Sequence, residues 1–151
     1  MTEKQTQQRI THNWQSVQQQ VRETAIACAR DPGSIRIIGV SKYVDENLTR
    51  ALTSAGCCEL GESRPQLMWQ KSQAMQDVTP LGWHMIGHLQ RNKVRRTLRC
   101  TPTIHSVDSE RLLSAIADEA VLQGICIDVL LEVNISGDQA KTGFLPEALQ
   151  S

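Results

Sequence analysis

One lysine stands two residues after an apolar run, where its amine could form a covalent bond. Residues 35–40 read IRIIGV, a short β-branched run bounded by turn residues, and Ser41 and Lys42 come next. Side chains alternate between the two faces of a strand, so Ile38, Val40 and Lys42 are expected on one face. Partial desolvation at the end of such a run favours the neutral amine, which attacks aldehydes. The same pattern also fits a lysine whose stem covers apolar surface while its ammonium reaches water.

A histidine in a later apolar run has the chemistry to contact a planar ligand. His84 lies within residues 81–86, a predicted strand, and shares a face with Ile86. Its neutral imidazole could stack on such a ligand or hydrogen-bond to it, or it could be a core histidine bonded by its neighbours. His88 stands four residues further on, but the glutamate of the HExxH motif is missing. We therefore expect no zinc site.

Polar groups also follow the other apolar runs. GES at 61–63 follows CCEL, GH at 87–88 follows WHMI, and NIS at 134–136 follows LLEV. In (β/α)₈ enzymes the working residues cluster at the carboxyl ends of the strands. These polar groups are therefore expected to gather at one end of the sheet.

Basic residues are concentrated in one short segment. They are Arg91, Lys93, Arg95, Arg96 and Arg99. At these spacings they cover much of a short helix, a pattern typical of a solvated helix face. The formal charge of the whole chain is zero, which argues against a general binder of nucleic acid. An RNA- or phosphate-binding α/β module that uses Arg91 to Arg99 stays an alternative.

Apolar spacing and turn residues predict the elements that position these groups. An apolar stripe predicts a helix over residues 7–30, which the turn residues at 31–33 end. Strands and helices then alternate. Strands are predicted over residues 35–40, 57–60, 81–86, 103–107 and 127–135. Helices are predicted over residues 44–55, 65–76, 92–99 and 109–123.

The alternation predicts an α/β fold with a parallel sheet. The strands begin at intervals of roughly 20 to 25 residues, as in a (β/α)₈ TIM-type barrel of roughly 250 residues. About five βα units are present, so we expect a partial barrel with an N-terminal helix over 1–33 and βα units over 34–151. The sequence is expected to be truncated within the helix after the fifth strand. The alternative is a complete five-stranded open α/β sheet.

Composition and missing motifs exclude several classes of protein. The polar start lacks the apolar segment of a secretory signal, and no run approaches the roughly 18 consecutive apolar residues of a membrane span. Five cysteines, an odd number without CxxC spacing, favour a reduced, cytoplasmic setting. The GxGxxG, GxxxxGK[ST] and GxSxG motifs are absent, so nucleotide-loop and α/β-hydrolase functions lack their sequence signatures.

Five short segments, in their order and spacing, resemble one protein family. They are GVSK at 39–42, LGES at 60–63, WHMIGHLQRNK at 83–93, HSVDS at 105–109 and EVNISGDQAKTGF at 132–144. The family is that of the pyridoxal phosphate homeostasis proteins, and the likeness covers residues 35–144. The resemblance implies the alanine racemase N-terminal barrel, a fold type III barrel that binds pyridoxal 5'-phosphate (PLP).

The resemblance also implies a cofactor site. Lys42 matches the lysine that holds PLP as a Schiff base, and Ser63 falls where the family's GEN motif has asparagine beside the cofactor. His84 and Asn134 match polar positions that line the barrel mouth. Residues 63–65 read Ser-Arg-Pro and depart from the usual Asn-Tyr-Val. The family's phosphate-binding residues lie in later βα loops, so we expect weak or no stable PLP binding by this chain alone.

The function implied by the resemblance is PLP binding in intracellular vitamin B6 homeostasis, without catalysis. A racemase also needs an acid/base group on the opposite face of its substrate. A PLP-dependent racemase-like enzyme and an α/β domain without a ligand are the alternatives, beside the RNA- or phosphate-binding module. We expect PLP as the partner, no contact with membrane or nucleic acid, and self-association through the exposed edges of a partial barrel.

Overall fold

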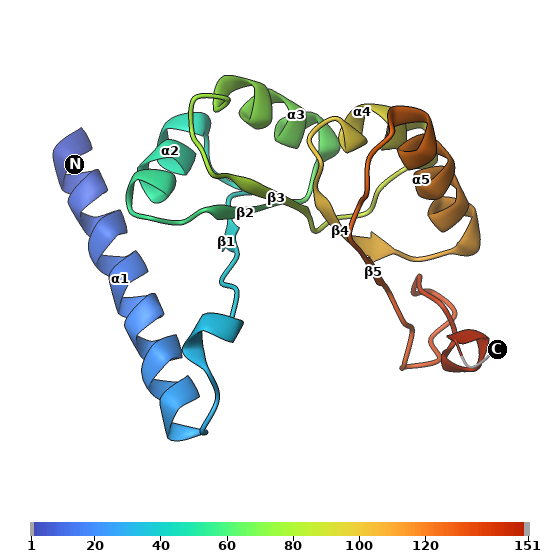
Figure 1. Cartoon of the computed structure of the whole chain (residues 1–151), viewed down its shortest axis with the longest axis horizontal. Helices are drawn as coiled ribbons and strands as arrows, with labels where there is room; N and C mark the ends of the chain where they lie inside the picture. The colour runs from blue at the N-terminus through green and yellow to red at the C-terminus, as the bar shows by residue number, and fades with distance from the viewer. Residues whose placement is uncertain (1, 150–151) are drawn as a thin grey trace.

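The structure is a computed structural model, and it describes residues 2–149. Strands and helices alternate along the chain (Figure 1). The strands are β1 (Gly39–Val40), β2 (Glu59–Glu62), β3 (Gly82–Met85), β4 (Thr103–Val107) and β5 (Val129–Leu131). The α-helices are α1 (Glu3–Ala27), α2 (Glu46–Ser54), α3 (Pro65–Ala74), α4 (Val94–Leu98) and α5 (Glu110–Gln123). The 3₁₀ helices are η1 (Pro32–Ser34), η2 (Arg91–Lys93) and η3 (Pro146–Leu149).

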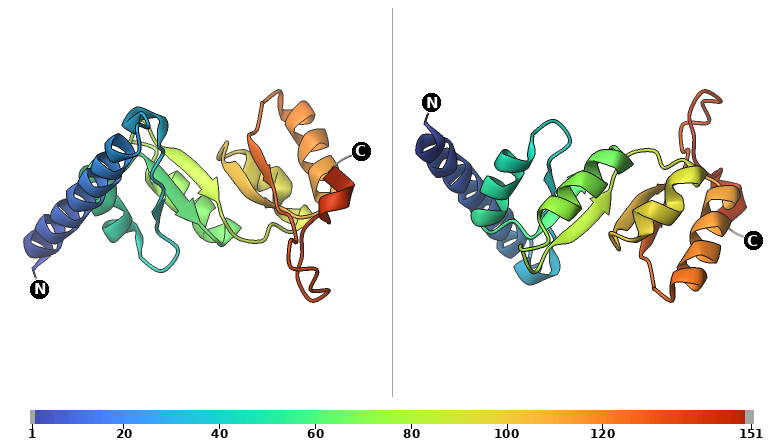
Figure 2. Two further views of the ribbon diagram at one scale, coloured as in Figure 1. Left: turned by 90° about the horizontal axis from the view of Figure 1, so that it is seen from below. Right: turned by 90° about the horizontal axis from the view of Figure 1, so that it is seen from above.

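The five strands form one parallel sheet in chain order, β1-β2-β3-β4-β5. Helices α2 to α5 lie on one face of this sheet, as the view from above in Figure 2 shows. A doubly wound open sheet reverses its strand order and carries helices on both faces, so the doubly wound arrangement does not describe residues 2–149. The predicted α/β fold with a parallel sheet is confirmed.

Several elements differ in their bounds from the sequence prediction. The strand predicted over 35–40 is reduced to the two residues of β1, and the strand predicted over 127–135 to the three residues of β5. Both lie at an edge of the sheet, where a strand is paired on one side only. The inner strand β2 begins later than predicted and continues to Glu62, because β1 and β3 both pair with it. The basic helix predicted over 92–99 is divided into η2 and α4.

The core lies between the sheet and the helices. Leu60, Trp83 and Met85 point from the strands toward the helices, where they pack in one apolar cluster with Met68 of α3 and Leu98 of α4. All five side chains are buried. These apolar contacts hold the helices against one face of the sheet. The side chains between them in each strand point to the opposite face.

The opposite face of the sheet carries Ile38 and Val40. A Cβ built on Gly61 would lie 3.2 Å from Ile38 Cγ2 and 3.4 Å from Val40 Cγ2, so both side chains stand over this residue of β2. The prediction that Ile38 and Val40 share a face is therefore confirmed. Val40 is 54% exposed, because no helix of residues 2–149 covers this side of its strand.

Capping residues determine where the helices begin and end. Asp45 Oδ1 accepts a hydrogen bond of 2.9 Å from the Leu48 amide and thereby starts α2. Ser109 starts α5 in the same way, and Gly124 ends it in the left-handed conformation with φ 65°. The start of α2 at Glu46 leaves residues 41–45 as the turn that follows β1, and this turn carries Lys42.

Helix α1 packs beside α2 at the β1 end of the sheet, and Trp14 on it is buried (Figure 1). It begins at Glu3, earlier than predicted, because Thr2 and Gln5 form a capping box. None of the helices in residues 2–149 has the combination of length and apolarity that crossing a membrane requires.

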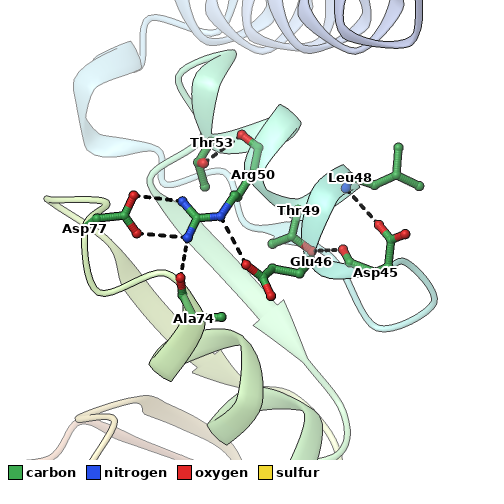
Figure 3. Close-up of polar contacts among 8 residues, drawn as sticks. All are labelled: Asp45, Glu46, Leu48, Thr49, Arg50, Thr53, Ala74 and Asp77. Carbon is green, nitrogen blue, oxygen red and sulfur yellow. Dashed lines mark hydrogen bonds and ion pairs between the residues drawn. The ribbon is translucent and has the colours of Figure 1, made fainter. Parts of the chain in front are cut away.

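Arg50 joins α2 to the segment that follows α3 (Figure 3). Its Nη1 and Nη2 donate to the two carboxylate oxygens of Asp77, each at 2.9 Å. Arg50 also donates to the Ala74 carbonyl oxygen and, through Nε, to Glu46 Oε1 at 3.2 Å. Hydrogen bonds from Arg50 are the main reason why the pKa of Asp77 is lowered. The guanidinium thus connects two consecutive βα units on the helix side of the sheet.

Candidate functional site

Lys42 lies two residues beyond the end of β1. Its side chain is half-buried, and Nζ lies 4.9 Å from the centroid of the Tyr43 ring. This ring is 87% exposed, so the cation–π contact is at the surface. Within residues 2–149, Lys42 Nζ has no hydrogen bond and no ion pair. The amine is therefore available to react with a carbonyl compound at the carboxyl end of β1.

The residue before Lys42 is fixed to the neighbouring strand. Ser41 is 1% exposed, and its amide donates to the Gly61 carbonyl oxygen at 2.9 Å. Its own carbonyl oxygen accepts a hydrogen bond of 2.7 Å from Lys71 Nζ of α3. The backbone at the base of the Lys42 side chain is thus bonded both to β2 and to a helix.

Ser63 follows β2 and is half-buried. Its amide donates to Glu62 Oε1 at 2.9 Å. The backbone of Ser63 also lies close to the segment after β3, because a Cβ built on Gly87 would collide with the Ser63 carbonyl oxygen. Glycine at position 87 therefore lets the carboxyl ends of β2 and β3 approach each other. The structure places Lys42 and Ser63 at the ends of adjacent strands, as the sequence indicates for both residues.

A buried ion pair lies beneath these two strand ends. Lys71 Nζ and Glu62 Oε2 are 2.8 Å apart, and both side chains are buried. The sequence indicated Glu62 as one of the polar groups at a strand end, without a role of its own, and did not mark Lys71. A signal for Lys71 is present: it stands three residues after Met68 and four before Met75, which are buried on the same stripe of α3.

His84 is bonded on both sides of its ring. Nε2 lies 2.9 Å from Glu59 Oε2, and Nδ1 lies 2.9 Å from Nε2 of His105. Arg36 Nε is 3.5 Å from the other oxygen of Glu59. His84 is 2% exposed, and it points away from the helices because it alternates with Trp83 and Met85. Of the two sequence interpretations of His84, the geometry supports the core histidine bonded by its neighbours.

The carboxylate of Glu59 assigns the protons along this row. A carboxylate only accepts, so His84 Nε2 carries a hydrogen. Between the two rings one nitrogen donates and the other accepts, over 2.9 Å. The pKa of His105 is lowered, first by burial and then by repulsion from His84. Both effects favour the neutral form of His105.

Asn134 is bonded inside its own loop. Its Nδ2 donates to the carbonyl oxygen of Asp138 at 2.9 Å, and its Oδ1 accepts from Ser136 Oγ at 2.9 Å. The Asn134 amide donates to the Phe144 carbonyl oxygen at 2.8 Å. The loop after β5 forms a surface pocket of about 370 Å³, lined in part by Ser136 and Lys141. Asn134 thus shapes this pocket, and its contact with a cofactor stays a prediction.

The basic residues of the α4 region are engaged in different ways. Arg96 lies over the Trp69 ring, with 4.4 Å from Cζ to the ring centroid. Arg95 Nε is 3.8 Å from Glu119 Oε1. Part of the basic concentration is therefore used in contacts between the helices, and no observation favours the RNA- or phosphate-binding alternative.

The chain is an α/β protein with a parallel sheet. The primary amine of Lys42, at the carboxyl end of β1, gives it a candidate site for a carbonyl compound. No family model matches the chain. The chain is 34% identical over 134 residues to the pyridoxal phosphate homeostasis protein of Aquifex aeolicus, and 33% identical over 140 residues to that of Pseudomonas aeruginosa. These alignments cover 89% and 93% of this chain, which spans 58% and 60% of the length of these relatives. The chain is homologous to the pyridoxal phosphate homeostasis proteins, and the resemblance predicted from its motifs is confirmed.

Solved structures share the fold. A protein of Bifidobacterium adolescentis superimposes with a TM-score of 0.84 at 30% identity, covering 99% of this chain and 64% of that one. PipY of Synechococcus elongatus, solved with PLP bound, superimposes with a TM-score of 0.73 at 31% identity, covering 86% of this chain and 60% of PipY. The parallel α/β arrangement described above is therefore also that of a protein that binds PLP.

Proposed function

We propose that this chain binds pyridoxal 5'-phosphate through Lys42 and serves vitamin B6 homeostasis in the cytoplasm without catalysing a reaction. The observation that carries the proposal is the half-buried Lys42 amine, which has no hydrogen bond or ion pair within residues 2–149. The names of the relatives and the PLP bound to PipY support the choice of ligand. A primary amine at the carboxyl end of a parallel strand fits the chemistry of an aldehyde ligand.

The cofactor supplies an aldehyde, with which a primary amine forms a Schiff base. Lys42 would hold the cofactor through its amine, with loss of water. The chain holds the base of this side chain through Ser41, whose amide and carbonyl groups are both bonded. Ser63, at the end of the adjacent strand, is the polar group that we assign to the neighbourhood of the bound ligand.

The proposed frame of the site is part of a (β/α)₈ barrel of fold type III. The strand order is sequential, all neighbours are parallel, and helices α2 to α5 lie on one face. A barrel of this type has these three features and places its ligand at the carboxyl ends of the strands. The similarity to PipY supports the same frame.

The absence of catalysis is part of the proposal. A racemase requires a second acid/base group opposite its lysine. His84 is buried, and both of its ring nitrogens are bonded to Glu59 and His105, so this histidine is not free for that role. Formation of D-alanine from L-alanine in the presence of PLP, lost in Lys42→Ala, would instead support the racemase alternative.

Self-association is the second part of the partner proposal. Leu130 of β5 and Ile135 in the loop after it are 52% and 88% exposed. Exposed apolar side chains beside a strand edge favour contact with another chain. Sedimentation at increasing protein concentration tests this proposal, and a monomer at all concentrations would contradict it.

The test of PLP binding is a spectral titration of the chain with PLP. We expect the absorbance of a weakly held Schiff base, which is lost on dilution, and we expect Lys42→Ala to abolish it. Lys4→Ala is the matched control, because Lys4 is an exposed lysine on α1. Equal spectra for the chain and for Lys42→Ala would contradict the proposal.

A further inference from the structure

We propose that Glu62 and Lys71 are positioning residues, which hold the Lys42 turn and Ser63 in place for the carbonyl ligand. This inference rests on the proposed function of Lys42. We assign neither Glu62 nor Lys71 a contact with the ligand. Glu62 lies on the helix side of β2 together with Leu60, and Lys71 reaches Glu62 from α3.

The pair is fully inside the protein. Glu62 is 0% exposed and Lys71 is 6% exposed, and Nζ and Oε2 are 2.8 Å apart. Taking two charges out of water costs about as much as their attraction returns, so a buried ion pair is a weak source of stability compared with apolar side chains of the same size. Its effect on this structure therefore lies in the groups that the two charges bond in addition to each other.

Each charge of the pair bonds the backbone at one strand end. Lys71 Nζ donates to the Ser41 carbonyl oxygen at 2.7 Å, directly before Lys42. Glu62 Oε1 accepts from the Ser63 amide at 2.9 Å. The ion pair therefore connects the backbone of the reactive lysine with the backbone of the serine on the adjacent strand, through charge-assisted hydrogen bonds that are shorter and stronger than neutral ones.

The helix fixes the pair from the other side. Met68 and Met75 of the α3 region flank Lys71 on the same stripe and are 0% and 1% exposed. The stem of Lys71 is thus held in the apolar core, and its ammonium has little freedom to follow the turn if that turn moves. A bimolecular reaction at a lysine depends on such orientation, and a misplacement of about 1 Å can cost on the order of 100-fold in rate.

The test measures how PLP distributes over the lysines of the chain. The chain is incubated with PLP, reduced with borohydride and digested, and the label on Lys42 is divided by the label on Lys4. The variant Glu62→Leu/Lys71→Met replaces the ion pair with apolar side chains of similar size, so we expect it to fold. We expect its Lys42-to-Lys4 ratio to fall by about tenfold or more.

A matched control removes an ion pair that has no contact with the Lys42 turn. Arg95→Gln/Glu119→Gln breaks the 3.8 Å pair between α4 and α5, and we expect it to leave the ratio unchanged. If the double variant at 62 and 71 does not fold, Glu62→Gln keeps the shape and the hydrogen-bonding oxygen, and we expect a smaller fall of the same ratio. An unchanged ratio in whichever of these two variants folds overturns the positioning role.

Amide hydrogen exchange separates this inference from the proposed function, because it needs no ligand. We expect the amides of Ser41 and Ser63 to exchange faster in the folded variant than in the parent chain. Equal exchange at both amides overturns the inference even if Lys42 binds PLP. If PLP labels Lys42 of the parent chain no more than Lys4, the proposed function is overturned instead. The positioning role then has no site to act on.

Discussion

His84 and His105 share a hydrogen bond on the face of the sheet that points away from the helices, with 2.9 Å between Nδ1 and Nε2. Glu59 accepts from the other nitrogen of His84, and the pKa of His105 is lowered by burial and by repulsion from His84. The row joins β2, β3 and β4 across the sheet. Its stability must therefore depend on pH and on the carboxylate at its end.

Acid should weaken the fold through His105. Its folded pKa lies below the ordinary value of 6.5, so the unfolded chain binds this proton more readily. The resulting stability is fully present above the unfolded pKa and is lost as the pH falls through the folded pKa. We expect a lower free energy of unfolding in urea at mildly acidic pH than at neutral pH. His105→Gln should flatten this dependence, and an equally steep dependence in the variant would contradict the assignment.

Removal of Glu59 should destabilise the chain. Glu59→Ala leaves the buried N–H of His84 without its acceptor, which costs about 1–3 kcal/mol. Glu59→Gln keeps an acceptor oxygen and should cost less. Chemical denaturation of the two variants measures the difference, and equal stability of Glu59→Ala and the parent chain would show that the row is not a stabilising contact.

The close approach at Gly87 predicts a difference between two glycine substitutions. A methyl group at Gly87 would meet the backbone of Ser63, so Gly87→Ala must displace a strand end and should cost about 1–3 kcal/mol or more. A methyl group at Gly137 would meet no atom within 4 Å, but the backbone there is left-handed, with φ 67°. Gly137→Ala should therefore cost only the strain of that conformation, about 1–2 kcal/mol. Thermal unfolding of both variants provides the comparison. Gly87→Ala at parent stability would contradict the close approach of the segments that follow β2 and β3.

The contact between Arg50 and Asp77 should stabilise the fold to a degree that depends on salt and pH. Arg50→Lys cannot donate to both carboxylate oxygens at once, so we expect a lower melting temperature. Because the pKa of Asp77 is lowered, the stabilisation is present above its ordinary value of 3.8 and is lost as the pH falls through the folded pKa. High salt should reduce the difference between Arg50→Lys and the parent chain, since the contact is exposed. An unchanged difference at all salt concentrations would argue against an ionic contribution.

Local signals were sufficient to predict most of the fold. Ser109 and Gly124 limit α5 as their residue types indicate, and the order of apolar runs gives the parallel sheet. The edge strands could not be predicted at their observed length. The run at 35–40 is rich in β-branched residues, but its pairing depends on how far β2 extends beside it, which is a property of the tertiary structure.

The candidate site could be predicted only in part. Lys42 is visible as a lysine close to the end of an apolar run, and its Nζ has no hydrogen bond or ion pair within residues 2–149; its role toward a cofactor stays a prediction. The partners of His84 are 21 and 25 residues away in the sequence, so its local pattern left two interpretations open. Glu62 and Lys71 come together only when β2 and α3 pack, and residue spacing along the chain does not predict such a contact. The roles of Ser63, His84 and Asn134 toward a cofactor stay predictions.

Peptide mapping of the parent chain after reduction with borohydride in the presence of PLP tests the central claim most directly. We predict that the reduced cofactor is found on the peptide that contains Lys42, in excess over the peptides of the exposed Lys4 and Lys141. A label spread over these lysines according to their exposure, or no label on Lys42, would contradict the claim.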